Sequence, residues 1–255
     1  MTAPLGAPTA QDRVTVGIGL AAVTTVAWAY LFFLASRMAM MGSPFAMPMT
    51  SAWTGGDLAL MWTMWAVMMA AMMIPSAVPM ISTYSTTISS KNTNLNGSTP
   101  LFVVGYLAAW SSFAAIATTA QWLLHDAALV DAMGASMNGF LGGVILVGAG
   151  GYQFTSVKNA CLNQCKTPIG FLLNEWREGP RGAVVMGLRH GTFCIGCCWA
   201  LMAMLFVLGV MNLWWIAAVA AIVLVEKLIA SSTLTRALGA VLAVWGTALI
   251  IGIGS

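Results

Sequence analysis

The chain alternates between long apolar segments and short polar connections. Each apolar segment is close to the roughly 20 residues that an α-helix needs to cross a bilayer. Seven such segments can be marked, and they run approximately over residues 14–35, 58–81, 101–124, 135–157, 182–209, 211–229 and 234–253. The pattern therefore predicts an all-α fold, a polytopic transmembrane helical bundle of about seven spans. The boundary that is hardest to place lies at residues 209–212, which must supply a tight turn.

The longest connection is predicted between the fourth and fifth segments, over residues 158–181. Within it, the apolar residues 171–173 are followed by polar residues and a tryptophan up to Arg177, a pattern typical of a short amphipathic helix in the headgroup region. We expect this interfacial helix to cover the inner mouth of the bundle. Residues 1–13 are interpreted as a cytoplasmic N-terminal tail and residues 14–255 as a single transmembrane domain.

The basic residues predict how the bundle is oriented. In a seven-span arrangement only Arg37 falls on one side of the membrane, and the other nine Lys and Arg residues fall on the opposite side. Those nine are Arg13, Lys91, Lys158, Lys166, Arg177, Arg181, Arg189, Lys227 and Arg236. Because cytoplasmic connections carry an excess of Lys and Arg, we expect a bacterial inner-membrane protein with a cytoplasmic N-terminus and a C-terminus outside.

Composition supports the membrane interpretation and excludes several function classes. Hydrophobic residues make up 60% of the chain and charged residues 7%, which leaves too little polar surface for a soluble domain. The net charge of +3 is carried by few residues, so nucleic acid is not an expected partner and the lipid bilayer is. The sequence contains no nucleotide-binding loop, catalytic triad or paired-carboxylate site, which favours a protein that is not an enzyme.

One stretch of the fifth segment, residues 189–202, carries three of the five cysteines and one of the two histidines. At about 100° per residue of an α-helix, four potential ligands for a soft metal share roughly a 100° arc of this segment. These four side chains are His190, Cys194, Cys197 and Cys198. Counting about 20 residues back from Gly209 places His190 near the cytoplasmic boundary and Cys198 about 12 Å deeper.

A second cysteine pair, Cys161 and Cys165, follows the inner end of the fourth segment with i,i+4 spacing. The two thiols share a face if that helix continues, and both cysteine groups are then expected to converge at the inner leaflet. Thiolate and imidazole bind Cu(I) or Zn(II), and graded ligands suit the transfer of a metal. Two alternatives stay open: thiol–disulfide or electron-transfer chemistry, and cysteines that only pack beside small glycines.

Methionine provides the other soft-ligand signal, because 12 of the 19 methionines fall between Met38 and Met80. Five of them lie in the polar connection after the first segment, on the predicted outer side, where thioethers can bind Cu(I) without being oxidised as thiols are. These five are Met38, Met40, Met41, Met47 and Met49. They predict an outer surface that collects copper.

The second segment contains Met64, Met68 and Met72, which recur at i+4 and form a stripe on one helical face. Such a stripe is typical of adaptable packing, but between two soft-ligand sites it also predicts a metal path. Pro75 and Pro79 are expected to kink or end this helix, and the freed carbonyl groups can line a cavity.

Two polar pairs near segment ends are weaker candidates. His125 and Asp126 lie at the outer end of the third segment, where solvated polar groups are common. Glu226 and Lys227 lie near the inner end of the sixth segment. There the lysine is expected to extend towards the interface, and the glutamate can face the bundle.

Several blocks of the sequence resemble a bacterial family of predicted metal-binding integral membrane proteins whose function is uncharacterised. The resemblance covers roughly residues 55 to 250. It rests on residues 64–75 with their Met-Met-Ile-Pro ending, on Tyr152-Gln153 with Lys158, Cys161 and Cys165, on residues 187–202 with Cys-Cys-Trp, on residues 211–213 and on Glu226-Lys227. It implies a membrane fold and a metal, and it adds weight to the five cysteines. The methionines of residues 38–49 lie outside these blocks.

These observations predict a membrane protein that binds a soft metal, most readily Cu(I) with Zn(II) as second candidate, through Cys, His and Met side chains. It would move the metal across the membrane or deliver it to a membrane metalloenzyme, with a metallochaperone as a further partner. The alternatives are a thiol–disulfide or electron-transfer protein and a non-catalytic assembly subunit. The oligomeric state does not follow from the sequence.

Overall fold

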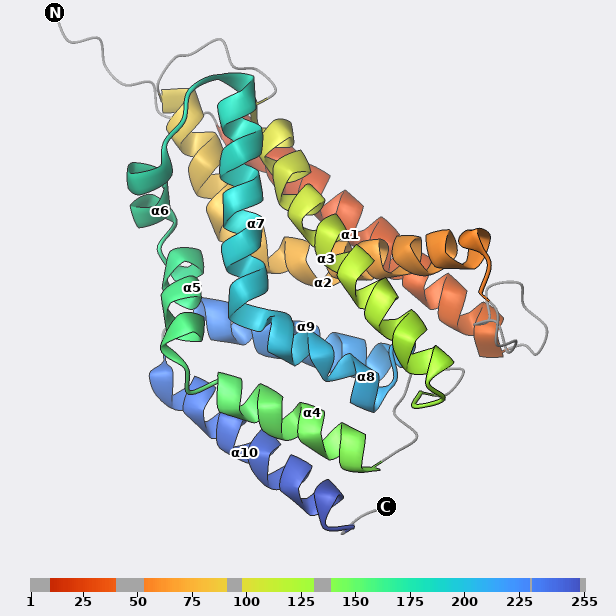
Figure 1. Cartoon of the computed structure of the whole chain (residues 1–255). Helices are drawn as coiled ribbons and strands as arrows, with labels where there is room; N and C mark the ends of the chain where they lie inside the picture. Colours follow the sequence, from red (N-terminus) through yellow and green to blue (C-terminus); the bar gives the residue numbers. More distant parts are fainter. Residues whose placement is uncertain (1–9, 40–52, 91–97, 131–138, 230, 253–255) are drawn as a thin grey trace, which may run out of the picture.

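A computed structural model describes residues 10–39, 53–90, 98–130, 139–229 and 231–252, and throughout these ranges the regular elements are helices (Figure 1). Their bounds are α1 Ala10–Ala39, α2 Gly55–Ser90, α3 Ser98–Asp126, α4 Gly139–Tyr152, α5 Ser156–Lys166, α6 Pro168–Glu175, α7 Gly179–Ala203, α8 Leu205–Leu208, α9 Leu213–Leu228 and α10 Ser232–Ile250. The expected all-α fold is confirmed.

Five helical segments in the described ranges are long and apolar enough to cross a membrane. They are Val14–Arg37, Gly55–Ile88, Ser98–Asp126, Gly179–Leu208 and Ser232–Ile250. The pair α4 and α5 makes a sixth if it counts as one broken span, whereas α9 has only 16 residues. The expected number of seven is therefore not confirmed. In Figure 1 the ends of α1, α3 and α10 lie on the same side of the molecule as the starts of α2, α4 and α9, so the helices joined by these connections run in opposite directions.

The fourth predicted segment does not continue straight into the cysteine pair. Helix α4 ends at Tyr152, and α5 begins at Ser156 after a bend of 65°. Thr155 starts the new helix, because its side chain accepts a hydrogen bond from the backbone N–H of Lys158. The break turns α5 onto α7 and gives Cys161 and Cys165 a helix of their own.

Two long helices change direction part-way along, as Figure 1 shows for α2 and α7. Pro75 and Pro79 lie inside α2, which continues through both prolines. Because Pro75 has no N–H, the carbonyl of Ala71 one turn earlier loses its helical partner. The indole N–H of Trp28 in α1 donates to that carbonyl at 3.2 Å. The carbonyl that loses its partner at the kink of α2 is therefore hydrogen-bonded by a neighbouring helix.

Helices α3 and α7 approach each other closely at small residues. A side chain added at Gly105 would overlap the backbone of Val184, and one added at Gly187 would overlap the backbone of Phe102. Backbones at this distance exclude lipid and give dense packing in membranes. The contact holds α7, which carries the cysteine stretch, firmly against α3.

Replacing Gly187 by alanine is expected to destabilise the protein by roughly 1–3 kcal/mol, because the added methyl group must push the α3 backbone away. Thermal unfolding of the purified protein in detergent measures this effect. Gly151→Ala is the matched control, since nothing lies within 4 Å of an added Cβ at that position. Equal unfolding temperatures for the two variants would contradict the close α3–α7 contact.

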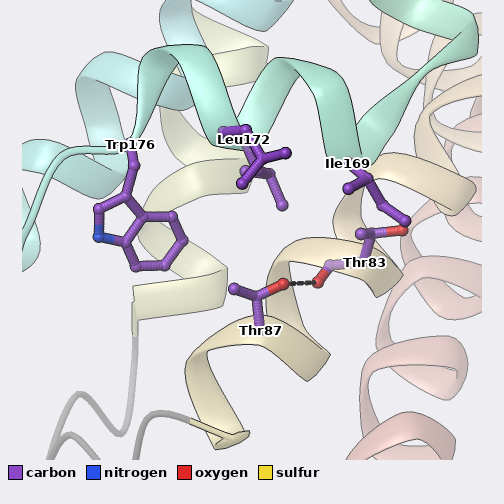
Figure 2. A pocket seen from close by; sticks show the side chains of 6 residues that line it. Thr83, Thr87, Ile169, Leu172 and Trp176 are labelled. Atoms are coloured by element: carbon purple, nitrogen blue, oxygen red, sulfur yellow. Dashed lines mark hydrogen bonds between the residues drawn. The ribbon is translucent and has the colours of Figure 1, made fainter.

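The expected amphipathic helix is present as α6, with Phe171 and Leu172 buried and Leu173 exposed. Arg189 of α7 forms an ion pair with Glu175 at the end of this helix. Between α6 and α2 lies a hollow of about 370 Å³, and Figure 2 shows Leu172 and Trp176 above Thr83 and Thr87. Helix α6 thus covers one side of the C-terminal half of α2 and brings Phe171 towards α7.

Candidate metal centre

Helix α7 runs without a break through the cysteine stretch, as the sequence predicts. His190, Cys194, Cys197 and Cys198 are all buried, with exposed fractions between 0% and 2%. The thiols of Cys197 and Cys198 both donate to the backbone carbonyl of Cys194 at 3.0 Å. The thiols of Cys197 and Cys198 are therefore both turned back towards Cys194.

The cysteine pair of α5 lies against the same part of α7. Cys165 is within hydrogen-bonding reach of the thiols of Cys194 and Cys197. Cys161 packs on the helix surface at Gly196, where an added Cβ would come within 2.7 Å of its sulfur. All five cysteines are free thiols. The expected convergence of the two cysteine groups is thus seen in the structure, although the bend before α5 produces it.

Cys194 also contacts a lysine that the sequence analysis treated differently. The ammonium group of Lys227 in α9 donates to the Cys194 sulfur and to the Ser76 hydroxyl, both at 2.8 Å. Lys227 is only 8% exposed, so the expectation that it extends to the interface was wrong. An ammonium group beside a sulfur stabilises the thiolate, which is the form that binds metals.

Tyr106 of α3 completes the surroundings of this sulfur. Its hydroxyl lies 3.1 Å from the Cys194 sulfur and donates to the Met73 carbonyl at 3.1 Å. Met73 and Ser76 belong to the part of α2 that contains Pro75, and Cys194 belongs to α7. The polar groups therefore connect α2, α3, α7 and α9 inside an apolar core.

A second buried polar network lies beside the first. The ammonium group of Lys158 donates to both carboxylate oxygens of Glu226, at 2.9 and 2.8 Å, and also to the side-chain oxygen of Gln153. The Lys158 and Glu226 side chains are 0% and 2% exposed. Lys158 and Lys227 therefore lie inside the protein, and neither can mark a cytoplasmic connection. The orientation expected from basic residues rests on the remaining seven of nine.

His190 lies one turn before Cys194 but inside a set of aromatic rings. The ring centroids of Phe171, Tyr106 and Phe102 are 5.4, 5.7 and 6.1 Å from the imidazole centroid. Its Nδ1 atom is buried without a hydrogen-bond partner. A buried unpaired ring nitrogen is unusual and keeps His190 a candidate ligand.

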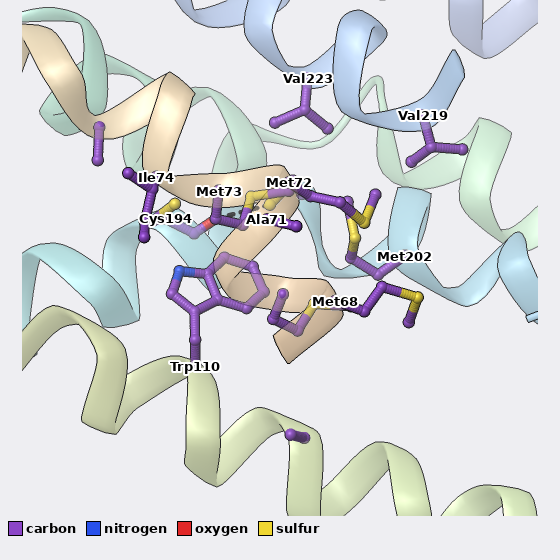
Figure 3. Packing of buried hydrophobic residues seen from close by; sticks show 14 of the residues in the cluster. Met68, Ala71, Met72, Met73, Ile74, Trp110, Cys194, Met202, Val219 and Val223 are labelled. Carbon is purple, nitrogen blue, oxygen red and sulfur yellow. Dashed lines mark hydrogen bonds between the residues drawn. The ribbon is translucent and has the colours of Figure 1, made fainter. Parts of the chain in front are cut away.

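The methionine stripe of α2 faces the core. Met64, Met68 and Met72 are each at most 3% exposed. Figure 3 shows Met68 and Met72 packed with Met202 of α7, in the same apolar cluster as Cys194. Met202 is the last residue of the 189–202 stretch and lies one turn after Cys198, and that spacing is the signal that could have identified it. The stripe therefore lies against the sulfur cluster rather than towards lipid.

The structure does not describe the methionines that the sequence predicts to collect copper on the outer side. Met40, Met41, Met47 and Met49 lie outside the described residues, and the side chain of Met38 is also outside them. At the end of α3, His125 accepts a hydrogen bond from the indole N–H of Trp53 at 3.2 Å. That contact ties His125 to the start of α2.

The sulfur atoms cluster around Cys194 without surrounding one point. Across the residues that the structure describes, no three His, Cys, Asp or Glu side chains form a group that could hold a metal ion. Zn(II) in structural sites takes four such ligands, whereas Cu(I) favours soft thiolates and thioethers. The donor set, with thiols beside methionine thioethers, therefore fits Cu(I) better than Zn(II).

Comparison with known proteins gives one family match. A family model described as PpoB2, a copper chaperone, matches residues 62–249. The matched region contains the five cysteines, the methionine stripe and Lys227, and it excludes the methionines of residues 38–49. No curated protein and no solved structure matches the chain.

Proposed function

We propose that this chain, which belongs to the PpoB2 copper chaperone family, binds Cu(I) within a bacterial inner membrane and passes it to a membrane metalloenzyme or a metallochaperone. The single observation that carries the proposal is the 2.8 Å contact of the Cys194 sulfur with the Lys227 ammonium group, beside the thiols of Cys165, Cys197 and Cys198. A sulfur cluster with a built-in cationic partner is more than packing requires.

The chemistry of the cluster suits a cargo rather than a resident metal. Cys194 would be the first ligand, because its sulfur is held by an ammonium group that a metal cation can replace. A second thiol is within reach from Cys165, Cys197 or Cys198. Several alternative second ligands at similar positions permit exchange, and exchange of ligands is what transfer to an acceptor needs.

The methionines give the proposed route to this cluster. The Met64, Met68 and Met72 stripe runs along α2 towards the Pro75 kink, and Cys194 lies against that part of the helix. Thioethers in a dry core bind Cu(I) weakly and reversibly compared with thiolates. We infer that copper enters from the side of residues 38–49, passes the stripe and reaches the thiols. The N-terminus is placed in the cytoplasm in this scheme.

Metal analysis of the purified, reduced protein tests the proposal. The wild-type protein should retain copper, and a variant with Cys194, Cys197 and Cys198 all replaced by serine should retain little, because the remaining thiols of α5 lack their partners. Ser112→Ala, which removes only an exposed hydroxyl, is the control.

Absence of both copper and zinc from the reduced wild-type protein would contradict metal binding. Thiol trapping in intact cells then separates the other functions. Cysteines that become oxidised in a metal-free protein would indicate thiol–disulfide exchange, and cysteines that stay reduced would indicate packing alone.

A further inference from the structure

One buried lysine, Lys227, lies next to the Cys194 sulfur, and its positive charge bears on which metal the cluster accepts. Lys158 donates to both carboxylate oxygens of Glu226, so the charge of Glu226 balances Lys158 rather than the neighbouring Lys227. The ammonium group of Lys227 instead contacts the Cys194 sulfur and the neutral hydroxyl of Ser76. Lys227 thus brings one positive charge to the sulfur cluster, and the cluster itself must balance it.

We propose that Lys227 selects the charge of the bound metal, favouring monovalent Cu(I) over divalent ions such as Zn(II). This inference rests on the proposed copper-binding function. Lys227 acts here as a specificity-determining residue. Its positive charge must be balanced by a metal–thiolate unit that carries one negative charge if the site is to be neutral inside the bundle. The side chain of Lys227 need not touch the metal.

The charge balance follows from the ligands that are within reach. Two thiolates, one Cu(I) and the ammonium group of Lys227 together carry no net charge. With Zn(II) in the same position, one positive charge is left over, and a third thiolate is needed to cancel it. Among the described side chains no three His, Cys, Asp or Glu residues are grouped so that they could hold a metal together. An uncompensated charge in a buried site is costly.

The size of the preference follows from Coulomb's law. An added unit of positive charge about 4 Å from an ammonium group, at an effective dielectric constant of about 20, is disfavoured by on the order of 1000-fold. Movement of the flexible lysine stem reduces this repulsion. We therefore expect Lys227 to contribute on the order of 100-fold to the preference for Cu(I) over Zn(II).

Competition titrations of the reduced protein in detergent, with Cu(I) and with Zn(II) against colorimetric chelators, test the inference. Lys227→Met keeps the length of the side chain without its charge, and Lys227→Gln provides a second uncharged variant with a polar end. Lys227→Arg keeps the charge. Ser76→Ala removes the neutral partner and leaves the ammonium group in place.

The two uncharged variants should gain Zn(II) affinity, so that their Cu(I) preference falls by on the order of 100-fold relative to the wild type. The arginine and Ser76→Ala variants should keep the preference. If both uncharged variants keep the preference while the wild type still binds Cu(I), the role of Lys227 is overturned and the proposed function stands. A wild-type protein that binds no Cu(I) would overturn the proposed function and this inference together.

Discussion

Replacing Cys194 by serine is expected to weaken Cu(I) binding by on the order of 100-fold or more, above the effect of any other single cysteine. Loss of a group that only supports a metal ligand costs about 10- to 100-fold in affinity. Cys194 is placed at the centre of the cluster, since its sulfur contacts Lys227 and its backbone carbonyl accepts from the thiols of Cys197 and Cys198. Equilibrium competition with a Cu(I) chelator measures the change.

Cys161→Ser is the matched control for this prediction, because Cys161 packs at Gly196 and is half-buried. It should lower the affinity far less. Cys194→Ser also leaves the ammonium group of Lys227 without its sulfur partner, which can destabilise the fold. The double variant Cys194→Ser/Lys227→Met removes both charges and should fold normally but still fail to bind Cu(I). Tight binding by the double variant would show that another residue is the principal ligand.

Replacing Glu226 by glutamine is expected to lower the free energy of unfolding by about 3–5 kcal/mol, because it leaves the buried ammonium group of Lys158 without a counter-charge. Denaturant or thermal unfolding in detergent measures the loss. The matched control is Glu175→Gln in the ion pair with Arg189, whose side chain is 45% exposed. An exposed pair contributes little, so that variant should unfold close to the wild type.

The double variant Lys158→Met/Glu226→Met should recover much of the lost stability, since replacing both partners of a buried ion pair by apolar groups is often neutral. A Glu226→Gln protein as stable as the Glu175→Gln protein would show that the Lys158 ammonium group finds another partner. The pair also connects α5 with α9, so its loss should loosen the position of Cys161 and Cys165.

The helices could be predicted from hydropathy because lipid-facing and core-facing surfaces are both apolar, and long apolar runs mark either. The break between α4 and α5 was not predicted. Its signal was local and weak: Gly150 and Gly151 precede it, and Thr155 can cap the helix that follows. Apolar residues on both sides, such as Phe154 and Val157, hid the turn within one continuous hydropathy maximum.

The cysteines of the site could be found from spacing, because three of them share one helix and the i,i+3 and i,i+4 rules apply within it. Their polar partners could not. Lys227 is 33 residues from Cys194, and Tyr106 is 88 residues from it. These contacts depend on how four helices pack, which no local pattern encodes. A lysine next to a glutamate in an apolar segment indicated buried polar partners more strongly than the snorkelling interpretation allowed.

The hydrogen bond from Trp28 to the Ala71 carbonyl gives α1 a role that the family match does not cover. The match begins at residue 62, and α1 ends before it. Yet the carbonyl that Pro75 deprives of its helical partner receives its donor from α1. In hydrocarbon an unsatisfied backbone carbonyl costs several kcal/mol. The N-terminal helix thus supplies a hydrogen-bond donor that the kink needs, and the shape of the family-matched region depends on a helix that lies outside it.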